Sequence, residues 1–136
     1  MFQSVAAAAS ANDAAVVGVD VDQHYIGEKA VAENGYNPFV TSAMKQLKNV
    51  TMTVLDALNS GSWETYGGKV TNFGLQEGDY VGLPTADSSW NFNTFTKDEY
   101  NTVLEGIRSG KIAVDNNSDS TVTPTVSAHT SVDYIG

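Results

Sequence analysis

Apolar side chains recur at helical spacing in three segments, which predicts three helices. The first helix covers residues 2–11, where the spaced positions are Phe2, Val5, Ala6 and Ala9. The second begins after Thr41 or Ser42, either of which can serve as its N-cap, and it ends at Gly61. Its apolar stripe consists of Leu47, Val50, Val54 and Leu58. In this interpretation Lys45 lies in the first turn, where a cation opposes the helix dipole, and this unfavourable position makes Lys45 a candidate functional residue.

The third helix begins at a capping box, Thr96-Lys97-Asp98-Glu99. The Thr96 hydroxyl can accept a hydrogen bond from the third amide of the helix while Glu99 reaches back to the cap. The apolar face that follows consists of Tyr100, Val103, Leu104 and Ile107. Gly110 ends this helix, and the sequence from Asp115 onward is rich in Ser, Thr, Asn and Asp, which predicts a mobile or extended tail.

Short apolar, β-branched runs predict the strands. Residues 15–19 (Ala-Val-Val-Gly-Val) form a continuous run that is typical of a strand buried on both faces of a parallel sheet. We expect residues 39–41 to form a second short strand after a long connection over residues 24–37. Residues 69–73 and 80–83 are two further strand-like segments. This order of elements predicts an α/β fold in which the first strand has no evident parallel neighbour within the chain.

The first predicted strand ends abruptly in acidic and polar residues, Asp20-Val21-Asp22-Gln23. In open α/β sheets, ligands bind outside the carboxyl ends of the strands. Asp20 and Asp22 are therefore candidates for ligand contact. At strand spacing their two carboxylates are expected to point the same way.

Composition and charge narrow the function classes. The chain has 136 residues, enough for one modest domain, with 41% hydrophobic and 17% charged residues. The 16 acidic and 7 basic residues give a net charge of −9, which repels phosphate backbones and argues against nucleic-acid binding. The absence of cysteine excludes disulfides, thiolate metal sites and cysteine nucleophiles. With only two histidines, His24 and His129, we expect no histidine-based metal site.

The remaining candidate chemistries are weak. Asp20 and Asp22 could do acid–base work, but no partner nucleophile or second acidic cluster accompanies them. The same two carboxylates with Asn34 could hold a hard cation, yet their spacing matches no calcium loop. The sequence therefore predicts no enzyme, no metal and no cofactor. Aromatic residues that could stack a ring or a sugar are expected mainly to pack in the core or on the surface, and they are Trp63, Tyr66, Trp90, Phe92 and Phe95.

Two motifs carry a resemblance to a known family. Val17-Gly18-Val19-Asp20-Val21-Asp22-Gln23 resembles the GVDxDQ signature of the basic membrane protein family of solute-binding lipoproteins, which includes purine nucleoside receptors of ABC importers. Val40-Thr41-Ser42-Ala43-Met44-Lys45 resembles the (V/L)TSxxK motif that follows it in that family. Weaker similarities, among them Ser109-Gly110-Lys111-Ile112, extend the resemblance over most of residues 1–115.

The resemblance implies a partial type I periplasmic-binding-protein fold, whose two Rossmann-like lobes close on the ligand. It implies a nucleoside, more often a purine nucleoside, held between the lobes, and an ABC transporter permease as the partner. Carried over to this sequence, the ribose-binding residues are Asp20 and Lys45, with Asp22 as the less favoured carboxylate. The loop between the two motifs is longer here than in the family.

The resemblance also bears on domains and location. Residues 1–115 are expected to be the C-terminal part of such a domain, and residues 116–136 a polar, flexible tail. The family's N-terminal lobe, signal peptide and lipobox cysteine have no counterpart here, so we expect a fragment of an extracytoplasmic, membrane-anchored parent. The run Ala7-Ala8-Ala9-Ser10-Ala11 superficially resembles a signal-peptidase site, but no basic residue or apolar stretch precedes it, which favours a helix end.

Two alternatives stay open at the level of sequence. The chain could be an interaction module that binds no small ligand and forms a homodimer through its open sheet edge. It could also be a small flavodoxin-like enzyme, although no phosphate loop or catalytic pair supports that hypothesis.

Overall fold

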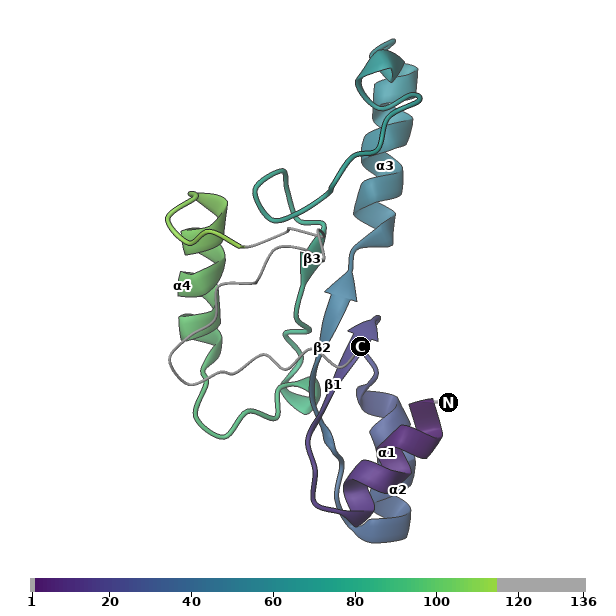
Figure 1. The fold of residues 1–136 in the computed structure, drawn as a ribbon, viewed down its shortest axis with the longest axis vertical. Coiled ribbons are helices and arrows are strands. Elements are labelled where there is room, and N and C mark those ends of the chain that lie inside the picture. Colours follow the sequence, from purple (N-terminus) through teal and green to yellow (C-terminus); the bar gives the residue numbers. More distant parts are fainter. Residues whose placement is uncertain (1, 115–136) are drawn as a thin grey trace, which may run out of the picture.

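The computed structural model describes residues 2–114 of the chain, and within them the fold is mixed α/β (Figure 1). Its helices and strands, in order, are α1 (Phe2–Ala11), β1 (Val16–Asp20), α2 (His24–Asn34), β2 (Phe39–Lys45), α3 (Leu47–Asn59), β3 (Val81–Gly82) and α4 (Lys97–Arg108). Two short 3₁₀ helices cover Trp63–Thr65 and Asp87–Ser89. The tail predicted for residues 116–136 lies outside the described residues.

The three strands form one sheet in the order β1-β2-β3, with β1 parallel to β2 and β3 antiparallel to β2. The expectation that β1 has no parallel neighbour in the chain is therefore wrong. Val17 pairs with Thr41 and Val19 with Ala43, so β1 and β2 run side by side to their carboxyl ends. In Figure 1, α1 and α2 lie on one side of the sheet, α4 lies on the other, and α3 extends beyond the end of β2.

The structure corrects the prediction that residues 24–37 are a long connection, because most of them form α2. The helix ends at Gly35, which has a left-handed φ of 74° and whose amide donates to the carbonyl of Val31. Its buried residues are the small Gly27 and Ala30. A helix that buries only small residues shows no stripe of large apolar side chains, which explains why periodicity missed it.

The second strand is longer than the pattern indicated, and this changes the place of three residues. Thr41 and Ser42 lie inside β2 and do not cap a helix. Lys45 is the last residue of β2, whereas the sequence predicted it in the first turn of the following helix. Helix α3 begins only at Leu47, with Gln46 at the N-cap position.

The strands predicted at residues 69–73 and 80–83 are only partly present. The first segment forms no strand, and the second contributes the two residues of β3. Aromatic packing replaces strand pairing in this region. The ring of Phe73 stacks on Tyr66 with the ring centroids 5.6 Å apart, and it makes a T-shaped contact with Tyr80 at a centroid distance of 4.8 Å.

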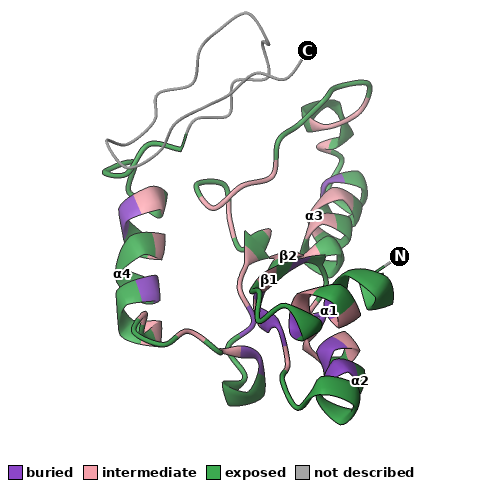
Figure 2. Cartoon of the chain, turned by 60° about the horizontal axis from the view of Figure 1, so that its bottom comes forward, coloured by how far each residue is buried: buried purple, intermediate pink, exposed green. Residues whose placement is uncertain are grey.

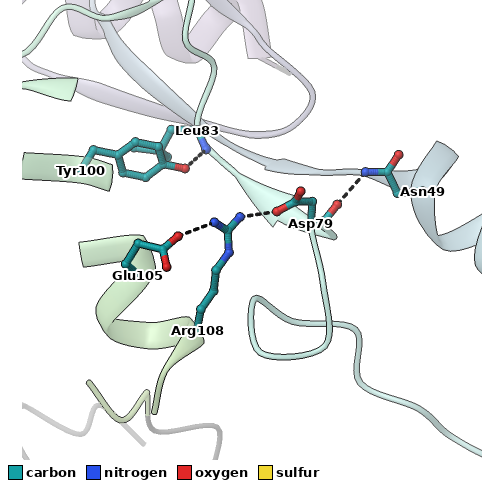
Figure 3. Close-up of polar contacts among 6 residues, drawn as sticks. All are labelled: Asn49, Asp79, Leu83, Tyr100, Glu105 and Arg108. Carbon is teal, nitrogen blue, oxygen red and sulfur yellow. Dashed lines mark hydrogen bonds and ion pairs between the residues drawn. The ribbon is translucent and has the colours of Figure 1, made fainter. Parts of the chain in front are cut away.

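Helix α4 forms as predicted, with both hydrogen bonds of the capping box between Thr96 and Glu99. Figure 3 shows polar contacts that tie it to the rest of the chain. The amide of Leu83 donates to the Tyr100 hydroxyl at 2.8 Å, and Arg108 pairs with Asp79. Asn49 of α3 donates to the carbonyl of Asp79 at 2.7 Å, which links the loop before β3 to α3.

The buried core of the described residues is small (Figure 2). Its apolar members are Ala6, Ala30, Phe39, Ala57 and Tyr100. Strand β1 is not buried on both faces as predicted, because Val17 is 61% exposed and Val19 43% exposed. One side of the sheet is thus covered by α1 and α2, while the side toward α4 stays largely open.

Candidate ligand-binding site

The carboxyl ends of β1 and β2 bring two of the predicted site residues together. Asp20 is the last residue of β1 and Lys45 the last residue of β2. Lys45 Nζ lies 2.7 Å from Asp20 Oδ1, with the two side chains 60% and 54% exposed respectively. Parallel pairing of the two strands explains how residues 25 positions apart in sequence meet at one edge of the sheet.

The backbone at Asp20 adopts an uncommon conformation. Its φ is +72°, in the left-handed region that residues other than glycine enter uncommonly, although asparagine and aspartate do so more often than most. The amide of Val21 donates to the carbonyl of Val19 at 2.9 Å, which closes a three-residue γ-turn centred on Asp20. Non-glycine residues held in such conformations cluster at functional sites. The turn directs the chain away from β1 and leaves the Asp20 carboxylate beside Lys45.

Asp22 has a different role from Asp20, and the two carboxylates do not act as a pair. One Asp22 oxygen accepts a hydrogen bond from the amide of His24 at 3.1 Å, at the start of α2. The other accepts from the Ser89 hydroxyl at 2.6 Å, which ties the 3₁₀ helix at Asp87–Ser89 to the loop after β1. Both carboxylate oxygens of Asp22 therefore accept hydrogen bonds within the chain.

The cation site considered for Asp20, Asp22 and Asn34 is not formed. Asn34 is the last residue of α2, and at 1.5 Å rise per residue it lies about 15 Å along the helix from its start beside Asp22. Within residues 2–114, no group of three or more His, Cys, Asp or Glu side chains is placed to hold a metal ion.

An apolar groove of about 540 Å³ adjoins Lys45 on the side toward α4. The sheet contributes Val19, Ala43, Met44, Lys45 and Val81 to its walls. Helix α4 contributes Tyr100, Val103, Leu104 and Ile107. Of the ion pair, Lys45 lines this open, apolar groove and Asp20 does not.

The aromatic residues considered for ring stacking are largely occupied with one another. Trp90 lies 5.0 Å from Phe92, 6.0 Å from Phe95 and 5.4 Å from Tyr100, measured between ring centroids. Its indole Nε1 donates to the carbonyl of Phe95 at 3.0 Å. Trp90, Phe92 and Phe95 therefore pack against one another as expected, whereas Trp63 is 47% exposed.

Reasoning from sequence missed three polar residues that support the site, namely Gln23, Ser42 and Ser89. All three are buried. Gln23 belongs to the GVDxDQ-like segment and Ser42 to the TSxxK-like segment. The motifs therefore included both residues, but they did not indicate what either residue contacts. Nothing in the sequence around Ser89 indicates its bond to Asp22, because the two residues are 67 positions apart.

Among the helices of residues 2–114, none combines the length and apolar character needed to span a bilayer. A scan of the sequence against protein-family models finds no match, and a search of curated proteins finds no match either.

Proposed function

We propose that this chain is the C-terminal part of a two-lobed solute-binding protein that binds nucleosides through Asp20 and Lys45. The observation that carries the proposal is the contact of 2.7 Å between these two side chains at the joined carboxyl ends of parallel strands. The resemblance of residues 17–23 and 40–45 to the motifs of nucleoside-binding lipoproteins supports it.

The chemistry of the pair suits a ribose. A carboxylate can accept hydrogen bonds from both hydroxyls of a vicinal diol, and such charge-assisted bonds are stronger than neutral ones. The Lys45 ammonium group, which lies beside the Asp20 carboxylate, can donate a hydrogen bond to an oxygen of the same sugar. Both side chains are more than half exposed, so a ligand can reach them without any rearrangement of the strands.

The exposure of the Asp20–Lys45 pair supports the inference of a second lobe that covers it. A ligand-binding site encloses most of a small ligand, and an exposed strand edge offers only one wall. The described residues expose many large apolar side chains, including Leu47, Leu58 and Val17. A covering surface would bury these residues. We infer a type I periplasmic-binding-protein architecture for the whole protein, with an ABC transporter permease as its partner and an extracytoplasmic, membrane-anchored location.

The test is a titration with inosine, guanosine and adenosine, followed by amide chemical shifts and by the melting temperature. A ligand that binds the native state raises the melting temperature by mass action. The matched ligand is 2′,3′-dideoxyinosine, which lacks the diol and should bind at least about tenfold more weakly, since a site built for hydroxyls is left with unpaired polar groups.

The variants Asp20→Asn and Lys45→Met should reduce nucleoside binding and leave the fold intact. The chain supplies a matched control in a second exposed ion pair, where Lys97 Nζ lies 2.5 Å from Asp87 Oδ1. Asp87→Asn and Lys97→Met should not change nucleoside binding. Equal binding of inosine and its dideoxy analogue, or binding by Asp20→Asn at the wild-type level, contradicts the assignment of the site.

A second candidate function is an interaction module that forms a homodimer. It is favoured by the position of β1 at the edge of the sheet, where the exposed Val17 could pair with another strand. Sedimentation at increasing concentration distinguishes the two candidates. A monomer at high concentration rules out the homodimer, whereas a dimer that Val17→Lys dissociates supports it.

A further inference from the structure

The side chain of Gln23 is hydrogen-bonded to the strand end that carries Asp20. Gln23 is only 5% exposed, although it follows the exposed Val21 by two residues. Its backbone amide donates to Ser42 Oγ at 3.0 Å, and its side-chain Oε1 accepts from the amide of Val19 at 3.2 Å. Gln23 is thus connected to both parallel strands, through Val19 of β1 and Ser42 of β2.

These contacts fix both backbone polar groups of Val19. The amide of Val19 donates to the Gln23 side chain. The carbonyl of Val19 accepts the hydrogen bond from Val21. Val19, the residue before Asp20, is therefore held by two hydrogen bonds, one to the Gln23 side chain and one from the Val21 amide.

Close packing leaves Gln23 little room to move. An added Cβ on Gly18 would lie 2.5 Å from Ser42 Oγ and 2.9 Å from Gln23 Oε1. The Gln23 side chain therefore rests directly on the backbone of β1 at Gly18. Ser42 is fully buried beside it.

We infer that Gln23 is a positioning residue for Asp20, and that its side-chain carbonyl maintains the left-handed conformation in which the Asp20 carboxylate meets Lys45. Left-handed backbone at a non-glycine residue is unfavourable and persists only where its surroundings enforce it. Gln23 supplies that enforcement through Val19. The inference about ligand binding rests on the proposed function, whereas the inference about the Asp20 backbone stands on the contacts alone.

The experiment compares two replacements of similar length in the full chain. Gln23→Met removes the acceptor, and Gln23→Glu keeps an oxygen acceptor at the same reach. Gln46→Met is the matched control, because it removes a glutamine side-chain amide one residue beyond Lys45. Gln46 takes no part in the two hydrogen bonds described above for Val19. Two NMR signals report the backbone. A positive φ brings the amide proton of Asp20 close to its own Hα and gives an intense intraresidue NOE, and the bond to Gln23 slows exchange of the Val19 amide.

Gln23→Met should lose the intense Asp20 NOE and the protection of the Val19 amide, while Gln23→Glu and Gln46→Met keep both. A folded Gln23→Met protein that retains both signals overturns the inference, as does their loss in Gln46→Met. If Gln23→Met does not fold, the inference is tested by the hydrogen-exchange rate of the Val19 amide in the wild-type protein. Exchange of Val19 at the rate of an unstructured peptide overturns the inference, and exchange slowed by about tenfold or more supports it.

Inosine titrations separate this inference from the proposed function. If the wild-type chain gives no response to inosine, the proposal that the chain binds nucleosides is wrong. The inference about the Asp20 backbone is then still tested by the NMR signals. If the wild type binds, Gln23→Met should weaken binding by about three- to tenfold, the range for loss of one net hydrogen bond, and Gln23→Glu should restore it. An unchanged affinity in Gln23→Met overturns the positioning role in binding.

Discussion

Replacement of Gly18 by alanine tests the packing that joins the two candidate motifs. Gly18 lies in β1 opposite the fully buried Ser42 of β2, and there is no room for a side chain at Gly18. The new methyl would approach Ser42 Oγ to 2.5 Å, Gln23 Oε1 to 2.9 Å and Gln23 Cβ to 3.0 Å. Real Cβ atoms do not occur at 2.5 Å, so the strand or the two side chains must shift.

The cost can be worked out from these contacts. Overpacking in a filled interior destabilises by about 1–3 kcal/mol. Displacement of Gln23 also weakens its bonds to Ser42 and Val19, each with a net value of about 1 kcal/mol. Alanine restricts the unfolded chain more than glycine, which offsets about 0.4–1 kcal/mol. We expect a net loss of about 2 kcal/mol, equivalent to a fall in melting temperature of roughly 6–10 °C for a chain of this length.

The assay is thermal unfolding followed by circular dichroism, with a double-mutant cycle as the diagnostic. Ser42→Ala removes the atom nearest to the new methyl, so Gly18→Ala combined with Ser42→Ala should be less destabilised than the sum of the single variants by about 1 kcal/mol. Gly74→Ala is the control, because the added methyl would meet only the exposed Glu77 carboxylate at 3.1 Å. Strict additivity in the cycle, or equal melting temperatures for Gly18→Ala and Gly74→Ala, would refute the reasoning.

Three other predictions concern Asp20 and α4. Because Asp20 has a positive φ, Asp20→Gly should be more stable to urea than Asp20→Ala by about 1 kcal/mol, the reverse of the usual order in a strand, and equal midpoints would contradict the strained turn. Thr96→Ala removes the N-cap of α4 and should lower the free energy of unfolding by about 1 kcal/mol, measured by the same urea titration. Hydrogen bonds from the Thr96 backbone and hydroxyl lower the pKa of Glu99 below its ordinary value of 4.5. A lowered pKa in the folded state stabilises the protein above the unfolded pKa, so this contribution should disappear as the pH falls below 4.5, and Glu99→Gln should remove that part of the pH dependence of unfolding.

Local patterns in the sequence were sufficient for those elements that depend on neighbouring residues. Helix α4 was predicted down to its capping box, because the bonds between Thr96 and Glu99 need only a three-residue spacing. Helix α1 was predicted from a stripe of apolar residues, and the mixed α/β class followed from the alternation of apolar runs. Asp20 was identified because a carboxylate follows an apolar run directly, and this feature needs no knowledge of the sheet.

Elements that depend on distant parts of the chain were missed or misplaced. Helix α2 buries only Gly27 and Ala30, so its sequence lacks the apolar periodicity from which a helix is predicted. The helix becomes evident only from its packing beside α1 and β2. Strand β2 extends to Lys45 because its neighbours β1 and β3 supply hydrogen-bond partners as far as Met44 and Lys45. No local signal distinguishes that extension from the start of a helix.

The sequence by itself determined which side chains could bind a polar ligand, and the tertiary structure decided which of them act together. Asp20 and Asp22 are equivalent in a local pattern. Parallel pairing of β1 with β2 places Lys45 beside Asp20, while the fold of residues 87–89 brings Ser89 to Asp22. Hydrogen bonds are short-ranged and directional, so a carboxylate's role depends on which partner the chain brings within about 3 Å. That choice is made by contacts between residues far apart in sequence.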